Sequence, residues 1–403
     1  MKKTFYFAAM AAFFLASCSS ENEVTPENNP SAASQEAVGF DTYASRTTRA
    51  TDAQNVTLEY LKKENIGFGV FAFDQGTQAL TSYTTTNATP TFFYNQQVKW
   101  NTAGNVWEYS PLKYWPNTEG NKVSFYAYAP YQKDLSTNAT PNKAGLRLIL
   151  ATNSYGPAIQ YTVPSGLSAG VDLCWGADAS LTTGDITSPI NRVKNTTTGE
   201  NQTITTTDRI KFNFKHALTK IAFNIQAHYD EETNGDNKGT NRLDKNTTIT
   251  VRSIKLVGSF ASKGVLSLYN GEWNAEKGVS QEVELLSQAI VMKAPETTDA
   301  TNNDDYIAEA ELFNGDAIML IPGGSFQIKV TYDVETTDAT NTANSSKVTN
   351  TVTSKDSYDL VAGQATAYHL NLGMTSVKFD AQVTDWADKA ATEVELPNNT
   401  KGN

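Results

Sequence analysis

Short runs in which apolar and polar residues alternate recur along the chain, separated by glycine, proline or asparagine. Examples are Ile66–Phe73, Phe92–Trp100 and Val123–Tyr131. A β-strand turns successive side chains to opposite faces, so this two-residue period predicts strands. Proline and glycine interrupt every window of helical length, which argues against helices. The chain is therefore predicted to be all-β, with the turn spacing of a meandering sandwich or barrel.

The length of 403 residues indicates two domains, because one hydrophobic core rarely serves so long a chain. Residues 182–208 are rich in Thr, Asn and Gly, as expected for a connection. We predict an N-terminal β-sandwich over residues 50–208 and a C-terminal one over residues 209–386. The tail, residues 387–403, contains one further strand-like tetrad, Glu393–Leu396.

Three patterns in the second half predict local structure. Ile210–Ile225 alternates on either side of His216, which indicates a strand, a kink and a second strand. Gly323-Gly324 joins Ala317–Pro322 to Phe326–Tyr332, the pattern of a β-hairpin. Glu335–Asn350 is low in complexity and is predicted to be a mobile loop.

The stretch Val38–Ala50 combines a strand pattern with an exposed tether. Val38 and Phe40 share one face of the predicted strand Val38–Tyr43. The residues that follow are polar and contain Arg46 and Arg49, so a protease can enter there. We therefore expect residues 19–49 to form a tether and a removable first strand.

The first 18 residues have the features of a signal peptide: a basic start at Lys2 and Lys3, then an apolar run too short for a membrane-spanning helix. The run ends in Leu15–Cys18, which looks like the lipobox of bacterial lipoproteins, in which the cysteine is lipidated. We favour this interpretation over a plain secretory signal with an incidental cysteine.

The net charge and the residue types argue against nucleic-acid binding, metal binding and catalysis. The formal net charge of −11 argues against a nucleic-acid partner. Lipidation of Cys18 leaves only Cys174, interpreted as a small buried hydrophobe. None of the three histidines pairs with a cysteine or another histidine at metal-ligand spacing, and neither a phosphate loop nor a nucleophile elbow occurs. We therefore expect no enzyme, no metal and no cofactor.

One aromatic cluster has two interpretations, a sugar-stacking platform or the filling of a core. We favour the core, because many of the rings alternate with polar residues as core strands do. The cluster comprises Trp100, Trp107, Tyr109, Tyr114, Trp115, Tyr126, Tyr128 and Tyr131.

Taken in order, these features resemble the fimbrillin family, the Mfa-like proteins that build type V pili of Gram-negative anaerobes. The resemblance covers nearly the whole chain. It is carried by the lipobox ending at Cys18, the strand and tether up to Ala50, Ile66–Phe73, Val98–Trp100, Tyr109–Pro116, Val123–Tyr131, Phe214–Ile221 and Val383–Trp386.

The resemblance implies two transthyretin-like β-sandwich domains and a structural pilin subunit. Such a precursor reaches the outer membrane as a lipoprotein through Cys18. A trypsin-like, Arg-specific protease then cuts between Arg49 and Ala50, with Arg46 as the alternate site. The strand carrying Val38 and Phe40 departs, and a strand from another subunit's tail, carrying Val394 and Leu396, fills the groove.

Two alternatives stay open. One is a tip adhesin or permanently lipid-anchored surface protein that binds host or microbial glycans or proteins. A surface hydrolase is more distant. A lipidated N-terminus retained in the mature protein would favour the anchored form.

Overall fold

In the computed structural model, the described residues are 37–44, 56–77, 89–116, 118, 120–150, 156–164, 170–189, 192–194, 203–204, 209–227, 246–275, 280–293, 308–311, 318–338, 340–372, 377–385 and 392–394. Strands are their main secondary structure, which confirms the predicted all-β class. The helical elements are α1 (Leu58–Leu61) and the 3-10 turn η3 (Thr342–Asn344). Among the described residues, no helix has the length and apolar character needed to cross a bilayer.

Two sheets belong mainly to the first half of the chain. The larger has the strand order β1-β11-β8-β5-β2-β3-β4; in addition, β9 pairs with β5, and β10 pairs with β9. Its strands are β1 (Phe40–Ala44), β2 (Phe68–Gly76), β3 (Phe93–Asn101), β4 (Val106–Glu108), β5 (Lys122–Ala129), β8 (Cys174–Asp178), β9 (Arg192–Lys194), β10 (Thr203–Ile204) and β11 (Ile210–His216). The smaller sheet, in the order β15-β14-β7-β6, comprises β6 (Leu146–Ile149), β7 (Ala158–Thr162), β14 (Lys263–Ser267) and β15 (Trp273–Ala275).

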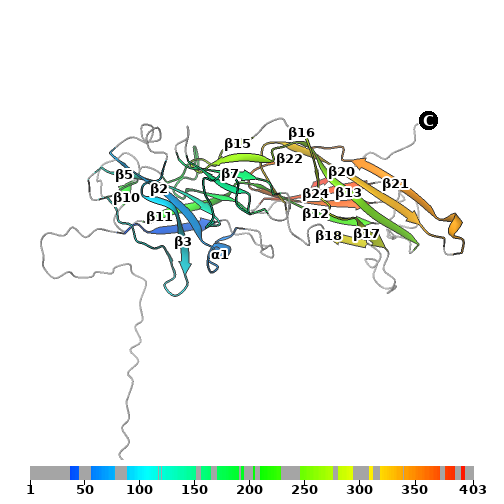
Figure 1. Ribbon diagram of the computed structural model, residues 1–403, viewed down its shortest axis with the longest axis horizontal. Helices are drawn as coiled ribbons and strands as arrows, with labels where there is room; N and C mark the ends of the chain where they lie inside the picture. Colours follow the sequence, from blue (N-terminus) through cyan, green and yellow to red (C-terminus); the bar gives the residue numbers. More distant parts are fainter. Residues whose placement is uncertain are drawn as a thin grey trace, which may run out of the picture. The chain divides into compact units, whose positions relative to one another are not determined.

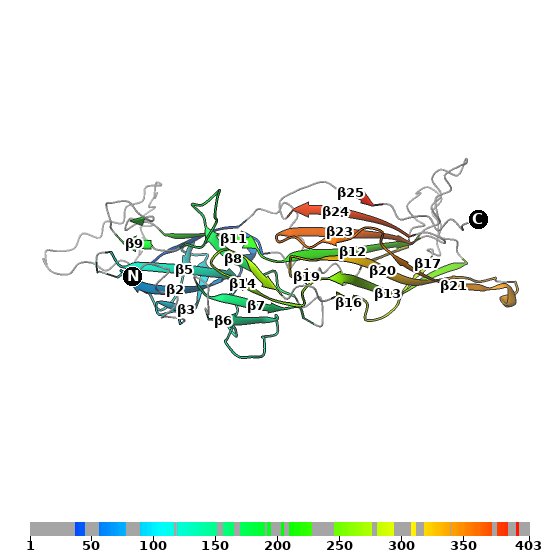
Figure 2. The same cartoon turned by 90° about the horizontal axis from the view of Figure 1, so that it is seen from above.

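Two further sheets are built from the second half. One follows the order β18-β12-β23-β24-β25, and Figure 2 shows its last four strands side by side; its strands are β12 (Thr219–Ala227), β18 (Ala308–Glu311), β19 (Ile318–Leu320), β23 (Gln364–Leu372), β24 (Val377–Asp385) and β25 (Thr392–Val394). The other centres on the long pair β13 and β20 (Figure 1); it comprises β13 (Thr247–Ser259), β16 (Ser280–Glu284), β17 (Ile290–Lys293), β20 (Ser325–Thr336), β21 (Ser346–Thr353) and β22 (Tyr358–Asp359).

Each pair of sheets encloses a core. Residues of β12, β19 and β23 pack against residues of β13, β17 and β20. In the first half, β2 is buried on both faces, as predicted for Ile66–Phe73. Its residues Phe71 and Phe73 face the core shared with β6, β7 and β14, while Phe68 and Val70 face a second core that includes β1. A Cβ at Gly67 would lie 2.0 Å from the Val98 carbonyl oxygen, so this glycine permits a close backbone approach.

Strand pairing crosses the predicted boundary between residues 208 and 209. β11 pairs with β8 and β1, and β14 pairs with β7. The predicted break after His216 is confirmed, because β11 ends there and β12 begins at Thr219 in another sheet. The division into domains at 50–208 and 209–386 stays a prediction.

Two local predictions were wrong. Ala317–Pro322 and Phe326–Tyr332 do not form a hairpin, because β19 pairs with β12 while β20 pairs with β13; the turn at Gly323, with φ of +87°, carries the chain from one sheet to the other. The predicted loop Glu335–Asn350 contains most of β21 instead, which pairs with β20 over residues 346–353.

Asp333 of β20 explains why β21 is ordered despite its polar composition. Its carboxylate is buried, bonds the Arg252 guanidinium and accepts a hydrogen bond from the Thr349 hydroxyl at 2.7 Å. Lys347 Nζ lies 3.2 Å away. The hydrogen bond from Arg252 contributes most to holding the pKa of Asp333 well below its usual range. Two residues of β21 are thus fixed to one charge on β20.

We predict that Asp333→Asn lowers the free energy of unfolding by about 2 kcal/mol at neutral pH, the scale of hydrogen bonds to a charged group. The folded pKa is depressed, so this stabilisation is present above the unfolded pKa of about 4 and is lost as the pH falls through the folded pKa. The difference from the wild type should therefore shrink below about pH 4 in denaturant titrations. Asp356→Asn, at an exposed position, is the matched control; equal pH profiles for wild type and Asp333→Asn would contradict the prediction.

Candidate functional site

β1 is an edge strand held by residues far away in the sequence. It pairs in parallel with β11, with Phe40 opposite Ile210 and Thr42 opposite Phe212. The Ile210 amide donates to the Gly39 carbonyl at 2.9 Å, and Arg209 Nη1 donates to the Phe40 carbonyl at 3.2 Å. In Figure 1, β1 is the blue arrow beside β11. The strand predicted over Val38–Tyr43 is thus present at a sheet edge, with the bounds Phe40–Ala44.

The residues just before β1 bond to a second edge. Ala37 forms an antiparallel bridge with Tyr114, and the Val38 amide donates to the Lys113 carbonyl at 2.9 Å. The Tyr109 hydroxyl donates to the Val38 carbonyl at 2.8 Å. The segment Ala37–Ala44 therefore closes the sheet between β11 and the segment that follows β4. Without it, both sets of backbone groups would lack these partners.

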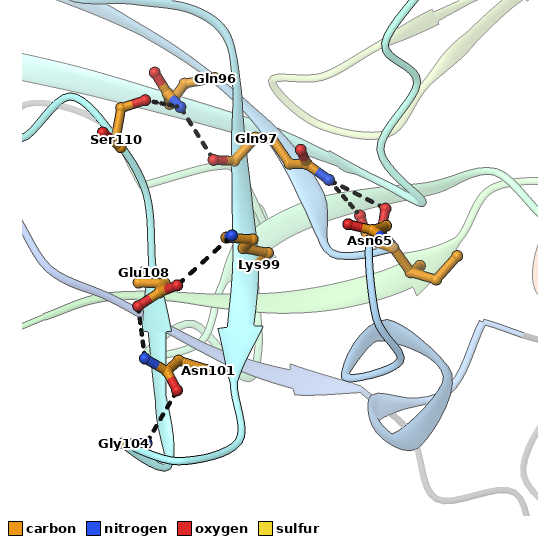
Figure 3. Close-up of polar contacts among 9 residues, drawn as sticks. Asn65, Gln96, Gln97, Lys99, Asn101, Gly104, Glu108 and Ser110 are labelled. Atoms are coloured by element: carbon orange, nitrogen blue, oxygen red, sulfur yellow. Dashed lines mark hydrogen bonds and ion pairs between the residues drawn. The ribbon is translucent and has the colours of Figure 1, made fainter.

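The hairpin β3–β4 supports that second edge through a row of polar contacts (Figure 3). Lys99 and Asn101 of β3 both contact Glu108 of β4, at 3.8 Å and 2.8 Å. Gln96 Nε2 donates to the Ser110 carbonyl at 3.3 Å, where the chain leaves β4. These contacts fix the start of the segment that receives Ala37 and Val38.

The side chains of the N-terminal strand complete an aromatic core. Val38 and Phe40 are both buried, as their predicted common face requires. The Phe40 ring stacks on Phe212 at 6.2 Å and meets four other rings edge-on at centroid distances of 5.5–6.3 Å, those of Phe68, Phe93, Tyr109 and Phe125. Phe40 is therefore the main apolar anchor of the strand.

After β1, the described chain resumes at Val56, which bonds the buried carboxylate of Asp172. Asp172 Oδ2 accepts from the Val56 amide at 2.7 Å, and its Oδ1 lies 2.9 Å from His216 Nδ1. The Thr57 hydroxyl then caps α1 by accepting from the Tyr60 amide. Asp172 thus joins the end of the tether to the start of β8 and the end of β11.

Cys174 extends this group, and its thiol is buried as predicted. Its Sγ lies 3.4 Å from His216 Nδ1, so the fold makes a His–Cys pair that sequence spacing did not indicate. Asp172, Cys174 and His216 are metal-ligating types, and their ligand atoms lie within 4.8 Å of one another. Burial raises the pKa of the Cys174 thiol, which opposes the thiolate that a metal requires.

The geometry of this group also differs from that of a thiol–imidazole relay. Such a relay uses the two ring nitrogens separately, one toward the nucleophile and one toward the carboxylate. Here the sulfur and the carboxylate both approach Nδ1. When Nδ1 donates to Asp172 it cannot also accept a proton from the thiol. The arrangement works as a hydrogen-bonded clamp on Val56.

The other predicted site residues are distributed as follows. Val394 lies in β25, an edge strand that pairs with β24 opposite Phe379. Cys18, Arg46, Arg49, Ala50 and Leu396 lie outside the described residues.

The aromatic cluster belongs mainly to the core, as predicted. Trp107, Tyr109, Trp115, Tyr126 and Tyr128 are buried. Burial raises the pKa of the Tyr109 phenol. Tyr114 is 45% exposed, beside Leu112 at 55%, close to the bridge with Ala37.

Comparison with known proteins assigns a family. The model of the fimbrillin-like family matches residues 48–386. The chain belongs to the fimbrillin-like family. The resemblance found in the sequence is therefore confirmed. A comparison with curated proteins finds no match.

Comparison with solved structures finds fimbrial and cell adhesion proteins. A fimbrial protein from Bacteroides vulgatus is 22% identical, with a TM-score of 0.55 over 87% of this chain and all of that one. A putative cell adhesion protein from Bacteroides ovatus has a TM-score of 0.42 at 14% identity, covering 88% of this chain and 99% of that one. The fimbrial anchor protein Mfa2 from Porphyromonas gingivalis has a TM-score of 0.33 at 10% identity, covering 89% and 99%. At 22% identity, the likeness to the Bacteroides vulgatus protein shows the fold alone.

We predict that Phe40→Ala lowers the free energy of unfolding of the uncut chain by about 3–5 kcal/mol, as for other large core residues. Asp41→Ala, on the opposite face of the same strand, should change it by about 0.5 kcal/mol or less. Urea denaturation followed by near-UV circular dichroism measures both. Equal effects of the two variants would show that the strand is not seated through Phe40.

We predict that Asp172→Ala lowers the free energy of unfolding by about 3 kcal/mol, because it removes the buried carboxylate that contacts both the Val56 amide and the His216 ring. Hydrogen exchange of the Val56–Leu61 amides should speed up beyond the change in global stability, since the clamp acts locally. Asp185→Ala removes an exposed carboxylate and is the control. Unchanged exchange in this segment would contradict the clamp.

Proposed function

We propose that this fimbrillin-like protein is a structural subunit of a surface fimbria that polymerises by strand exchange. The observation that carries the proposal is the seat of β1. This strand fills an aromatic core through Phe40 and pairs with β11, and Ala37 and Val38 just before it bond the segment that follows β4. Residues 45–55 link it covalently to the body that begins at Val56. Those residues include Arg46 and Arg49.

In this proposal the precursor is exported as a lipoprotein, and lipidated Cys18 holds it at the outer membrane. An Arg-specific, trypsin-like protease cuts between Arg49 and Ala50, or after Arg46. The strand from Val38 to Tyr43 then leaves. The Asp172 clamp keeps Val56 and α1 in place, so the vacated groove retains its shape.

The incoming strand comes from the tail of another subunit and carries Val394 and Leu396. A strand added at an edge makes main-chain hydrogen bonds along it, and alternate side chains enter the groove. Within the described part of the tail, β25 pairs with the edge of β24 over the three residues Thr392–Val394. Head-to-tail donation joins two different surfaces and does not close, which produces a filament.

The proposal is tested with Arg46→Ala and Arg49→Ala combined. We expect the double variant to remain full-length, lipidated and monomeric at the cell surface, because the strand cannot leave. Immunoblots of surface fractions measure the length of the chain, and electron microscopy of sheared fibres measures its assembly. Arg147→Ala, at a half-buried arginine outside the tether, is the control and should polymerise normally.

Deletion of residues 387–403 tests donation of the tail strand separately from proteolytic cutting of the tether. The truncated precursor should be cut normally but should fail to extend fibres. Normal fibres from either variant would overturn strand exchange. A wild-type surface form that retains its lipidated N-terminus would favour a permanently anchored surface protein or a tip adhesin instead.

A further inference from the structure

β1 carries one polar side chain on the face that enters the core. Val38, Phe40 and Thr42 are two residues apart and therefore share that face. Thr42 is 7% exposed. Within the described part of the chain, its hydroxyl oxygen is out of contact with solvent and has no hydrogen-bond partner. A buried hydroxyl that gives up water without gaining a partner weakens the strand that carries it.

Thr42 differs from Gln75, another buried side chain with an unpartnered polar atom. The Gln75 amide nitrogen is also without a partner among the described residues, but the Gln75 oxygen accepts from the Ser124 hydroxyl at 2.6 Å. Threonine has a single polar atom, so at Thr42 the whole hydrogen-bonding capacity is unused. The burial of the Thr42 hydroxyl is therefore not offset by any hydrogen bond among the described residues.

The surroundings of Thr42 favour an aliphatic group in its place. Thr42 pairs in register with Phe212, whose ring stacks on Phe40 and lies 6.0 Å from both Phe68 and Phe214. Valine has the shape of threonine, with a methyl group in place of the hydroxyl. A strand with valine here would keep every main-chain bond and lose the unpaired hydroxyl.

We propose that Thr42 is a specificity-determining residue, which makes the resident strand weaker than an incoming strand that carries an aliphatic side chain at the same position. This inference rests on the proposed strand exchange and adds the position where the two strands are distinguished. Main-chain hydrogen bonds are available to any strand in the seat, so only the side-chain difference selects between occupants. Val394 and Leu396 supply aliphatic side chains of the required kind.

The test compares Thr42→Val with Thr42→Ser in the full-length chain. Before cutting, Thr42→Val should raise the thermal midpoint, while Thr42→Ser, which keeps the hydroxyl and loses a methyl group, should not. After cutting by an Arg-specific protease, release of the N-terminal fragment is followed by size exclusion and mass spectrometry. We expect release from Thr42→Val to be about tenfold slower than from the wild type, the scale of one unsatisfied buried hydroxyl.

A Thr42→Val chain that is no more stable than the wild type, or that releases its fragment as fast, would overturn the inference. The proposed strand exchange is tested separately, with a synthetic peptide of residues 387–403 added to the cut wild-type chain. If that peptide neither speeds release nor binds, strand exchange with this tail fails. The thermal midpoints of the uncut variants still decide the role of Thr42 in that case.

Discussion

The structure depends on one pairing, in which β1 lies against β11 and inserts Phe40 among the rings of the first core. The residues in contact are separated by about 170 positions in the sequence, as for Arg209 and Phe40. β11 has β8 on its other side, so without β1 it becomes a sheet edge with unpaired backbone groups. An exposed edge next to an open aromatic groove invites pairing with another chain. In the proposed exchange, β1 must therefore stay in the groove beside β11 until the incoming strand is present.

The body is arranged so that the departure of this strand affects one face of the large sheet. The face toward β6, β7 and β14 has its own core, which includes Phe71, Tyr126 and Tyr161 and none of the residues of β1. β2 belongs to both cores, because its side chains alternate between them. In the proposed exchange, the second core and the Asp172 clamp would together keep the shape of the groove after β1 leaves. A groove that collapsed would have to be rebuilt at each exchange.

Local pattern was sufficient for much of this fold. The alternation of Ile66–Phe73, the strand Val38–Tyr43 and the break after His216 follow from side-chain period alone, and the structure contains all three. Which strands pair with one another could not be predicted from the local sequence. The turn at Gly323 has the signal of a hairpin but connects two sheets, and β21 is ordered by Asp333 on a neighbouring strand. The cluster brings His216 to Asp172 and Cys174, which lie more than 40 positions away in the sequence, so spacing could not reveal it. A carboxylate within the apolar run from Val171 to Trp175 was the available signal.

In the proposed exchange, cutting the tether would change the free energy of β1 binding to its groove without changing any contact of the bound strand. Before the cut, residues 45–55 hold β1 at a high effective concentration beside its groove, so an occasional opening is followed by return of the same strand. After the cut, a strand that leaves is diluted, and return becomes bimolecular. The groove then binds whichever strand has the better combination of affinity and local concentration. In the proposed exchange, a neighbouring subunit would supply its own strand on a tether and would so gain the advantage that the resident has lost. Proteolysis would then give the exchange its direction, even between strands of similar intrinsic affinity.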